Sequence, residues 1–216
     1  MKNEICPVSG ETEQDERINH LTHLLGLFLS VIGLLVLIIV PGKQNDVLTR
    51  IGAIIYGVTL VSLFTASTFY HGWTLGKDIK RILRIIDHSC IFLLIAGTYT
   101  PFMMGPLRDV GGWTLLIIEW GIAAAGILVK ICAVHRFKVV STLAYLAMGW
   151  LVVFSWPALE ENVSSTSIDC LIAGGILYSL GTIFYLWKSL PHSHPIWHLF
   201  VLGASIAHYF AVLNLL

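Results

Sequence analysis

The sequence predicts an all-α integral membrane protein, built as a bundle of seven transmembrane helices. Of its 216 residues, 56% are hydrophobic and only 12% are charged, and the mean hydropathy is +0.80. A soluble domain cannot keep so much apolar surface away from water. A hydrocarbon layer about 30 Å thick is crossed by roughly 20 helical residues, which leaves room for about seven spans with short loops. The apolar runs are continuous rather than alternating, so helices are favoured over a barrel.

The first three spans are expected near residues 18–40, 48–71 and 82–103. An acid-rich tail, residues 1–17, precedes the first of them and lacks the basic start and apolar stretch of a signal peptide. Charged residues, Pro and Gly bound each apolar run. We therefore expect a short cytoplasmic tail followed by one membrane domain that covers residues 18–216.

The last four spans are expected near residues 112–133, 139–156, 168–187 and 195–216. Short loops that contain charged residues or Pro separate these runs, and none is long enough for a separate soluble domain. The composition and the spans together predict a multi-pass protein of the inner or plasma membrane.

The placement of Lys and Arg predicts how the bundle is oriented. Cytoplasmic loops of membrane proteins carry an excess of these residues. Ten of them fall in the tail and in the second, fourth and sixth loops, whereas three fall on the opposite side. The N-terminus is therefore expected in the cytoplasm and the C-terminus outside. The ten are Lys2, Arg17, Lys77, Lys80, Arg81, Arg84, Lys130, Arg136, Lys138 and Lys188, and the three are Lys43, Arg50 and Arg108.

Net charge and cysteines exclude two other kinds of protein. The formal net charge is zero and no long block of like charge occurs, so nothing indicates a nucleic-acid partner. The cysteines, Cys6, Cys90, Cys132 and Cys170, form no CxxC pair, and a disulfide framework is not expected.

Polar residues cluster near the ends of three spans that all face the same side of the membrane. His71 ends the second span, Asp87 lies in the first turns of the third, and His194 and His198 begin the seventh. His194 and His198 are four residues apart, so they share one helix face, and Ser67 shares a face with His71 in the same way. Three imidazoles and a water are a familiar ligand set for catalytic zinc. This pattern predicts a metal site at the cytoplasmic ends of the helices.

The role of Asp87 stays open at this stage, because a carboxylate can bind a metal or act as a general base beside it. A single His at a membrane interface is usually hydrogen-bonded or directed to the headgroups, but three at one depth beside a carboxylate favour a shared ion. Three imidazoles can hold zinc or another divalent ion.

Other buried or interfacial polar residues are weaker candidates. Asn19 and His23 can reach toward the same cavity and are expected at most to support the ligands. His88 points about 100° away from Asp87 on a helix, and His208 lies about 15 Å beyond His198, too far for the same ion. Glu119 lies well inside the fourth span, where an ionisable group is by default a functional candidate, and a neutral, hydrogen-bonded structural role is an equal alternative.

Five motifs carry a resemblance to a known family. They are STFYH at 67–71, DH at 87–88, AGTYTPF at 96–102, MGW at 148–150 and HPIWH at 194–198. With these motifs the chain resembles a bacterial hemolysin III type member of the progestin and adipoQ receptor family, which is related to the alkaline ceramidases. The resemblance begins near the first span and runs to the C-terminus.

The resemblance implies a seven-helix fold with a cytoplasmic N-terminus, in agreement with the charge count. It also implies that Zn²⁺ is bound by the matching residues His71, His194 and His198. In that family the residue matching Asp87 holds a zinc-bound water, and the residue matching Ser67 lies beside the site. Ceramide hydrolysis is associated with receptor members of the family.

The leading hypothesis is therefore a zinc-dependent membrane hydrolase of a lipid amide or a related ester, with a lipid of the surrounding bilayer as its substrate. One alternative is a non-catalytic sensor or regulator of lipid composition, in which zinc only ties helices together. Another is a cytolytic protein, although no polar stripe runs through any span. The oligomeric state does not follow from the sequence.

Overall fold

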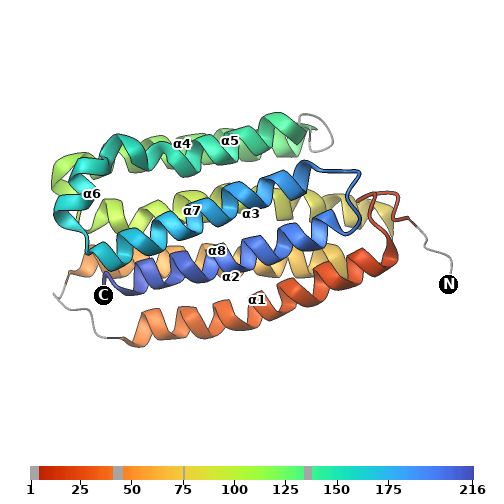
Figure 1. Ribbon diagram of the computed structural model, residues 1–216, viewed down its shortest axis with the longest axis horizontal. Helices are drawn as coiled ribbons and strands as arrows, with labels where there is room; N and C mark the ends of the chain where they lie inside the picture. Colours follow the sequence, from red (N-terminus) through yellow and green to blue (C-terminus); the bar gives the residue numbers. More distant parts are fainter. Residues whose placement is uncertain (1–4, 41–45, 75, 134–137) are drawn as a thin grey trace.

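The computed structural model describes residues 5–40, 46–74, 76–133 and 138–216, and within them the chain is a bundle of antiparallel helices (Figure 1). Seven of the described helical segments are long and apolar enough to cross a membrane, and these ranges contain no β-strand. The two termini lie at opposite ends of the bundle, as an odd number of spans requires. The predicted fold class is confirmed.

The helices follow the predicted spans closely. Two short irregular turns, Arg108–Gly112 and Leu151–Ser155, precede α4 and α6. The bounds are α1 Glu13–Ile39, α2 Val47–Gly72, α3 Lys77–Met104, α4 Trp113–Ala133, α5 Lys138–Trp150, α6 Trp156–Asn162, α7 Ser165–Leu186 and α8 Ser193–Leu213.

The bundle is built from pairs of neighbouring helices. α2 packs against α1 on one side and α3 on the other, α3 packs against α4, and α8 packs against α7 and α1. α1 lies along one edge of the bundle in Figure 1, and α4 and α5 lie along the opposite edge. α5 has fewer neighbours and borders an internal cavity that also contacts α3, α7 and α8.

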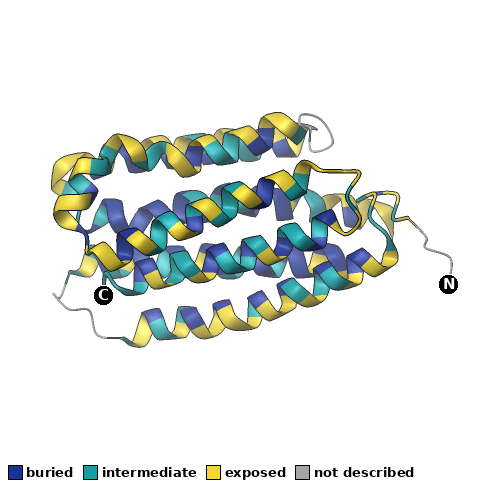
Figure 2. Cartoon of the chain, in the orientation of Figure 1, coloured by how far each residue is buried: buried dark blue, intermediate teal, exposed yellow. Residues whose placement is uncertain are grey.

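Figure 2 shows which parts of each helix are exposed and which are buried. Many large apolar side chains are exposed, while a set of polar and charged ones is buried. Phe28, Ile117 and Phe154 are 64%, 71% and 85% exposed, whereas Asn19 and Glu119 are fully buried. A soluble protein would place these classes the other way round. The arrangement suits a surface that contacts lipid, where helices satisfy their own backbone groups.

The fifth span differs from the single helix expected at 139–156. It consists of α5, a 3₁₀ turn and the short α6, because Pro157 in the first turn of α6 has no N–H with which to continue the helical hydrogen bonds of the preceding span. The Tyr99 hydroxyl contacts the backbone groups that the break leaves free. It lies 2.8 Å from the carbonyl oxygen of Met148, to which it donates, and accepts from the N–H of Val152 at 2.8 Å.

The first helix starts earlier than the expected residue 18. Thr12 caps it by accepting a hydrogen bond from the N–H of Asp15, and acidic residues occupy the first turn. Acidic side chains near a helix N-terminus are favourable, so these residues suit a helix rather than a loose tail.

The structure describes most of the Lys and Arg residues that were used in the charge count. Lys2, Lys43 and Arg136 of that count lie outside the described residues. Which end faces the cytoplasm stays a prediction of the sequence, and we refer below to the end that carries the N-terminus as the N-terminal end.

Candidate metal centre

The end of α2 supplies the first part of the site. His71 lies in the last turn of this helix and Ser67 lies one turn before it, and the two are 3% and 2% exposed. α2 ends one residue later at Gly72, and the backbone becomes extended at Trp73. The imidazole is therefore held at the rim of the bundle but under its surface.

The start of α8 supplies the second part. His192 precedes the helix with a left-handed φ of 58°, and Pro195 occupies the first turn, where its missing N–H removes no helical hydrogen bond. His194 and His198 follow each other by one turn, and their ring centroids lie 4.8 Å apart. The two rings share one face of α8, as their spacing predicts.

The three histidines converge at the N-terminal end of the bundle. Nitrogen atoms from His71, His194 and His198 all lie within 4.8 Å of one another. The Nε2 atom of His71 and the Nδ1 atom of His198 are buried without a hydrogen-bond partner among the described residues. Leaving such atoms unsatisfied costs free energy, and a shared cation relieves that cost. The donor set thus fits a divalent ion, and it forms a possible three-histidine metal site.

Ser67 and Asp87 lie beside the histidines on the wall of an internal cavity. Asp87 projects from α3 and is 9% exposed, and Ser67 is close enough to donate a hydrogen bond to its carboxylate. Both line a cavity of about 170 Å³, together with His194 and His198. The sequence-predicted residues are therefore brought together from α2, α3 and α8.

The cavity extends from the histidines into the apolar interior of the bundle. Its wall is mainly apolar and comes chiefly from α3, α5, α6, α7 and α8. Representative lining residues are Leu94, Phe102, Leu146, Leu159, Ile172 and Val201.

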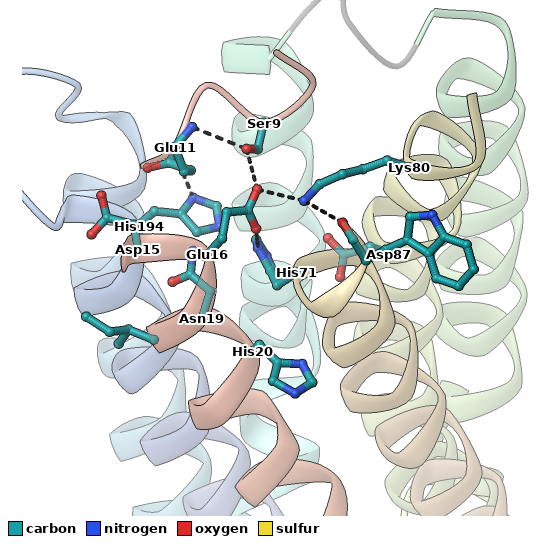
Figure 3. Close-up of polar contacts among 12 residues, drawn as sticks. Ser9, Glu11, Asp15, Glu16, Asn19, His20, His71, Lys80, Asp87 and His194 are labelled. Carbon is teal, nitrogen blue, oxygen red and sulfur yellow. Dashed lines mark hydrogen bonds and ion pairs between the residues drawn. The ribbon is translucent and has the colours of Figure 1, made fainter. Parts of the chain in front are cut away.

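The sequence analysis missed one residue that contacts the site. Glu16 was assigned to the tail, yet it lies in the first turns of α1, and its Oε2 atom is 2.7 Å from Nδ1 of His71 (Figure 3). Its other oxygen lies 3.0 Å from Nζ of Lys80 and accepts a short hydrogen bond from Ser9. The signal that could have found it is Thr12 followed three residues later by Asp15, a helix-start pattern.

The weaker candidates occupy different environments. His23 is buried, stacks on His198 with centroids 3.6 Å apart and lines the cavity. His88 lies with Nδ1 2.7 Å from the carbonyl oxygen of Arg84, away from the histidine cluster. His208 lines the cavity further along α8. Glu119 is fully buried, and neither carboxylate oxygen has a hydrogen-bond partner among the described residues, so the expected hydrogen bonding is not seen.

Comparisons with known proteins show the family of this chain. The haemolysin-III related family matches residues 12–209. The chain is 46% identical to the Hemolysin-3 homolog of Bacillus subtilis (strain 168) over 202 residues, and these residues cover 94% of each chain. It is 46% identical over 200 residues to Hemolysin-3 of Bacillus cereus, covering 93% of this chain and 91% of that one. The human Monocyte to macrophage differentiation factor is 29% identical over 223 residues, covering 97% and 89%.

These matches confirm the resemblance drawn from the five motifs. The bacterial relatives and the seven apolar helices make the chain a multi-pass integral protein of the plasma membrane. The match covers nearly all of the helical bundle, including every histidine of the cluster and both polar residues beside it. The chain belongs to the haemolysin-III related family.

Proposed function

We propose that this protein is a zinc-dependent hydrolase of a lipid amide or a related ester. One observation carries the proposal: three imidazoles, a carboxylate and a hydroxyl meet at the N-terminal end of an apolar cavity within a membrane bundle. A site that only tied helices together would not need a carboxylate and a hydroxyl on the wall of such a cavity.

His71, His194 and His198 would hold the ion. Three imidazoles leave a coordination position for water or substrate, whereas a closed structural zinc site has four protein ligands. Among the described residues no cysteine or further histidine joins the group of three. Zinc bound in this way supplies Lewis acidity that polarises a carbonyl and lowers the pKa of water toward about 7.

Asp87 is proposed as the general base that accepts a proton from the attacking water. It lies on the cavity wall beside the histidines but outside their group of three. Ser67 lies on the same wall, where its one hydroxyl hydrogen would be donated to the developing negative charge on the carbonyl oxygen. The proton held by Asp87 then passes to the amide nitrogen as the carbon–nitrogen bond breaks, so that a neutral amine leaves.

The shape and position of the cavity favour a lipid substrate. Its wall is mainly apolar and lies among helices that cross the membrane, so a hydrocarbon chain can occupy it at little cost in solvation. The polar residues occupy one end only, which would place a single reactive carbonyl beside them. The amide is chosen over other linkages because the family resembles the alkaline ceramidases.

A cytolytic function is the second candidate, because the two Bacillus relatives carry the name Hemolysin-3. The same purified protein can test it by dye release from liposomes at a defined protein density. Leakage that persists in a variant without turnover would favour this function over the hydrolase.

The test uses the full chain in detergent or lipid nanodiscs, with Asp87→Asn as the variant. Asp78→Asn is the matched control, because Asp78 lies on the same helix with a side chain that is 92% exposed. Zinc per chain is measured by elemental analysis, and turnover by release of a fluorescent fatty acid from ceramide and from matched ester lipids.

We expect about one zinc per chain in all three proteins and a fall in kcat of roughly 10²–10⁴-fold in Asp87→Asn alone, the usual contribution of a general base. Loss of zinc in Asp87→Asn would instead make this residue a ligand. Wild-type protein that holds zinc but releases no fatty acid from any of these lipids would overturn the hydrolase and favour a sensor of lipid composition.

A further inference from the structure

We infer that Glu16 is a positioning residue for the metal site, which fixes the ring of His71 so that its Nε2 atom is presented to the ion. The inference rests on the metal site of the proposed function, but it does not require turnover. It concerns a residue of the first helix turns that contacts no part of the cavity.

The contact between these residues has the geometry of a directed hydrogen bond. Oε2 of Glu16 is 2.7 Å from Nδ1 of His71, and the two side chains are 9% and 1% exposed. A carboxylate can only accept, so the Nδ1 atom must carry the hydrogen. The Nε2 atom is then left with its lone pair, and it is the ring nitrogen that is buried without a partner among the described residues.

Both oxygens of Glu16 are used, which explains why the carboxylate is held rigidly. Oε2 accepts from His71, while Oε1 accepts from Lys80 at 3.0 Å and from Ser9 (Figure 3). Lys80 is itself fixed by donating to the carbonyl oxygen of Trp73 at 3.2 Å. A metal-bound histidine commonly donates its second N–H to a carboxylate, which sets ring orientation and raises ligand basicity.

Residues 8–19, which include Glu16, also contact the other two histidines. Glu11 places Oε1 3.7 Å from Nδ1 of His194, and His198 lies against the backbone of Asn19. The segment is anchored to α3 by the Arg84 side chain, which donates to the carbonyl oxygen of Val8 at 2.7 Å. Each of the three histidines is thus next to a residue between Glu11 and Asn19, and the contact of Glu16 with His71 is the shortest.

A buried ion pair with Lys80 could also explain Glu16 as a purely structural residue. The two roles differ in what Glu16→Gln should do. Glutamine offers one acceptor atom, so it can serve His71 or Lys80 but not both. A positioning role predicts weaker zinc binding with the fold retained, whereas a structural role predicts lower stability with zinc affinity unchanged.

The test measures the zinc dissociation constant of the full-length protein in detergent by competition with a chromogenic chelator. Asp15→Asn is the matched control, because it removes the same charge one residue away and its partner His192 is not among the three. Absorption spectra of the cobalt-substituted proteins report on the ligand field of the ion independently of activity.

We expect Glu16→Gln to bind zinc roughly 10–100-fold more weakly and to alter the cobalt spectrum, with Asp15→Asn like the wild type. Equal zinc affinity in Glu16→Gln and the wild type would overturn the inference while leaving the hydrolase intact. Zinc affinity that depends on Glu16 in a protein without turnover would leave the inference standing and sink the hydrolase. Wild-type protein that binds no zinc would overturn both.

A measurement on the wild type covers the case in which Glu16→Gln does not fold. Long-range ¹H–¹⁵N correlation spectra of the zinc-loaded protein, labelled at histidine, identify which ring nitrogen carries the hydrogen. The signals of His71 are assigned by their loss in His71→Gln. We expect Nδ1 protonated and Nε2 bound to the metal, and the opposite tautomer would refute the positioning role.

Discussion

A close backbone contact between α2 and α3 gives a sharp test of the bundle that carries the site. A Cβ atom added to Gly52 would lie 2.6 Å from Cα and 2.9 Å from N of Pro101. Both are backbone atoms, which cannot rotate away as a side chain could. Gly121 is a matched control because it is also helical, yet nothing lies within 4 Å of its added Cβ.

The expected magnitude follows from these distances. Carbon atoms pack best at about 3.5–4.0 Å, so Gly52→Ala must push the two helices roughly 1 Å apart. Overpacking of this kind costs about 1–3 kcal/mol. Both substitutions gain up to about 1 kcal/mol in helix propensity, which cancels in the comparison. Gly52→Ala should therefore be about 1–3 kcal/mol less stable than Gly121→Ala.

The assay is thermal unfolding of the full-length variants in one detergent, followed by circular dichroism. For a chain of this size, about 1 kcal/mol shifts the melting temperature by roughly 2–4 °C. A melting temperature of Gly52→Ala equal to that of Gly121→Ala would refute the close crossing. The positions of Ser67 and Asp87, which depend on α2 and α3, would then be in doubt as well.

Three further predictions concern the ion and two acidic residues. Zinc at 100 times its dissociation constant should stabilise the wild type by about 2.7 kcal/mol in thermal unfolding, and His194→Ala/His198→Ala should show no zinc-dependent shift; a shift in the variant would place the ion elsewhere. Burial alone would raise the pKa of Asp46, but hydrogen bonds to its carboxylate and the nearby Arg108 lower this pKa below 3.8. The contribution of Asp46 to the free energy of unfolding is therefore complete above pH 3.8 and is lost as the pH falls through the lowered pKa. Asp46→Asn keeps a good helix cap and should lose less stability than the wild type on acidification, and parallel acid melting curves would contradict this. Glu119 has no hydrogen-bond partner among the described residues, so Glu119→Leu should raise the free energy of unfolding by about 1–3 kcal/mol in the same melts. A lower free energy of unfolding in this variant would indicate that Glu119 has a bound partner.

The fold could be predicted from the sequence because lipid imposes a simple requirement on each span. A run of about 20 apolar residues must be helical when no water is present to satisfy its backbone. The break in the fifth span was not predicted, because Pro157 marks only one side of it and the free backbone groups are satisfied by a contact from another helix. Tyr99 on α3 satisfies backbone groups near residue 150 only after α3 and α5 have packed together.

The candidate ligands could also be predicted, because helical spacing alone aligns His194 with His198. What the sequence did not reveal is the environment behind these rings. Glu16 and His71 are 55 residues apart, and no local pattern connects them. Residues 1–17 were expected to form a polar tail because charged residues at a chain end usually stay in water. Here Glu16 is buried because its charge is matched by Lys80 and by the hydrogen-bonded imidazole.

The metal site thus has two unlike faces, and under the proposed function each has its own task. On one side of the rings lie carboxylates and Lys80, which orient the imidazoles and carry charge. On the other side lies the apolar cavity, with Asp87 and Ser67 at its N-terminal end. Polar groups that act on the ligands are therefore separated from the space where an acyl chain would lie. A substitution behind the rings should change zinc affinity more than lipid preference, and a substitution on the cavity wall should do the reverse. Comparing Glu16→Gln with a bulky replacement of Val201 on the wall, by zinc affinity and by relative turnover of short-chain and long-chain lipids, would show whether the two faces act separately.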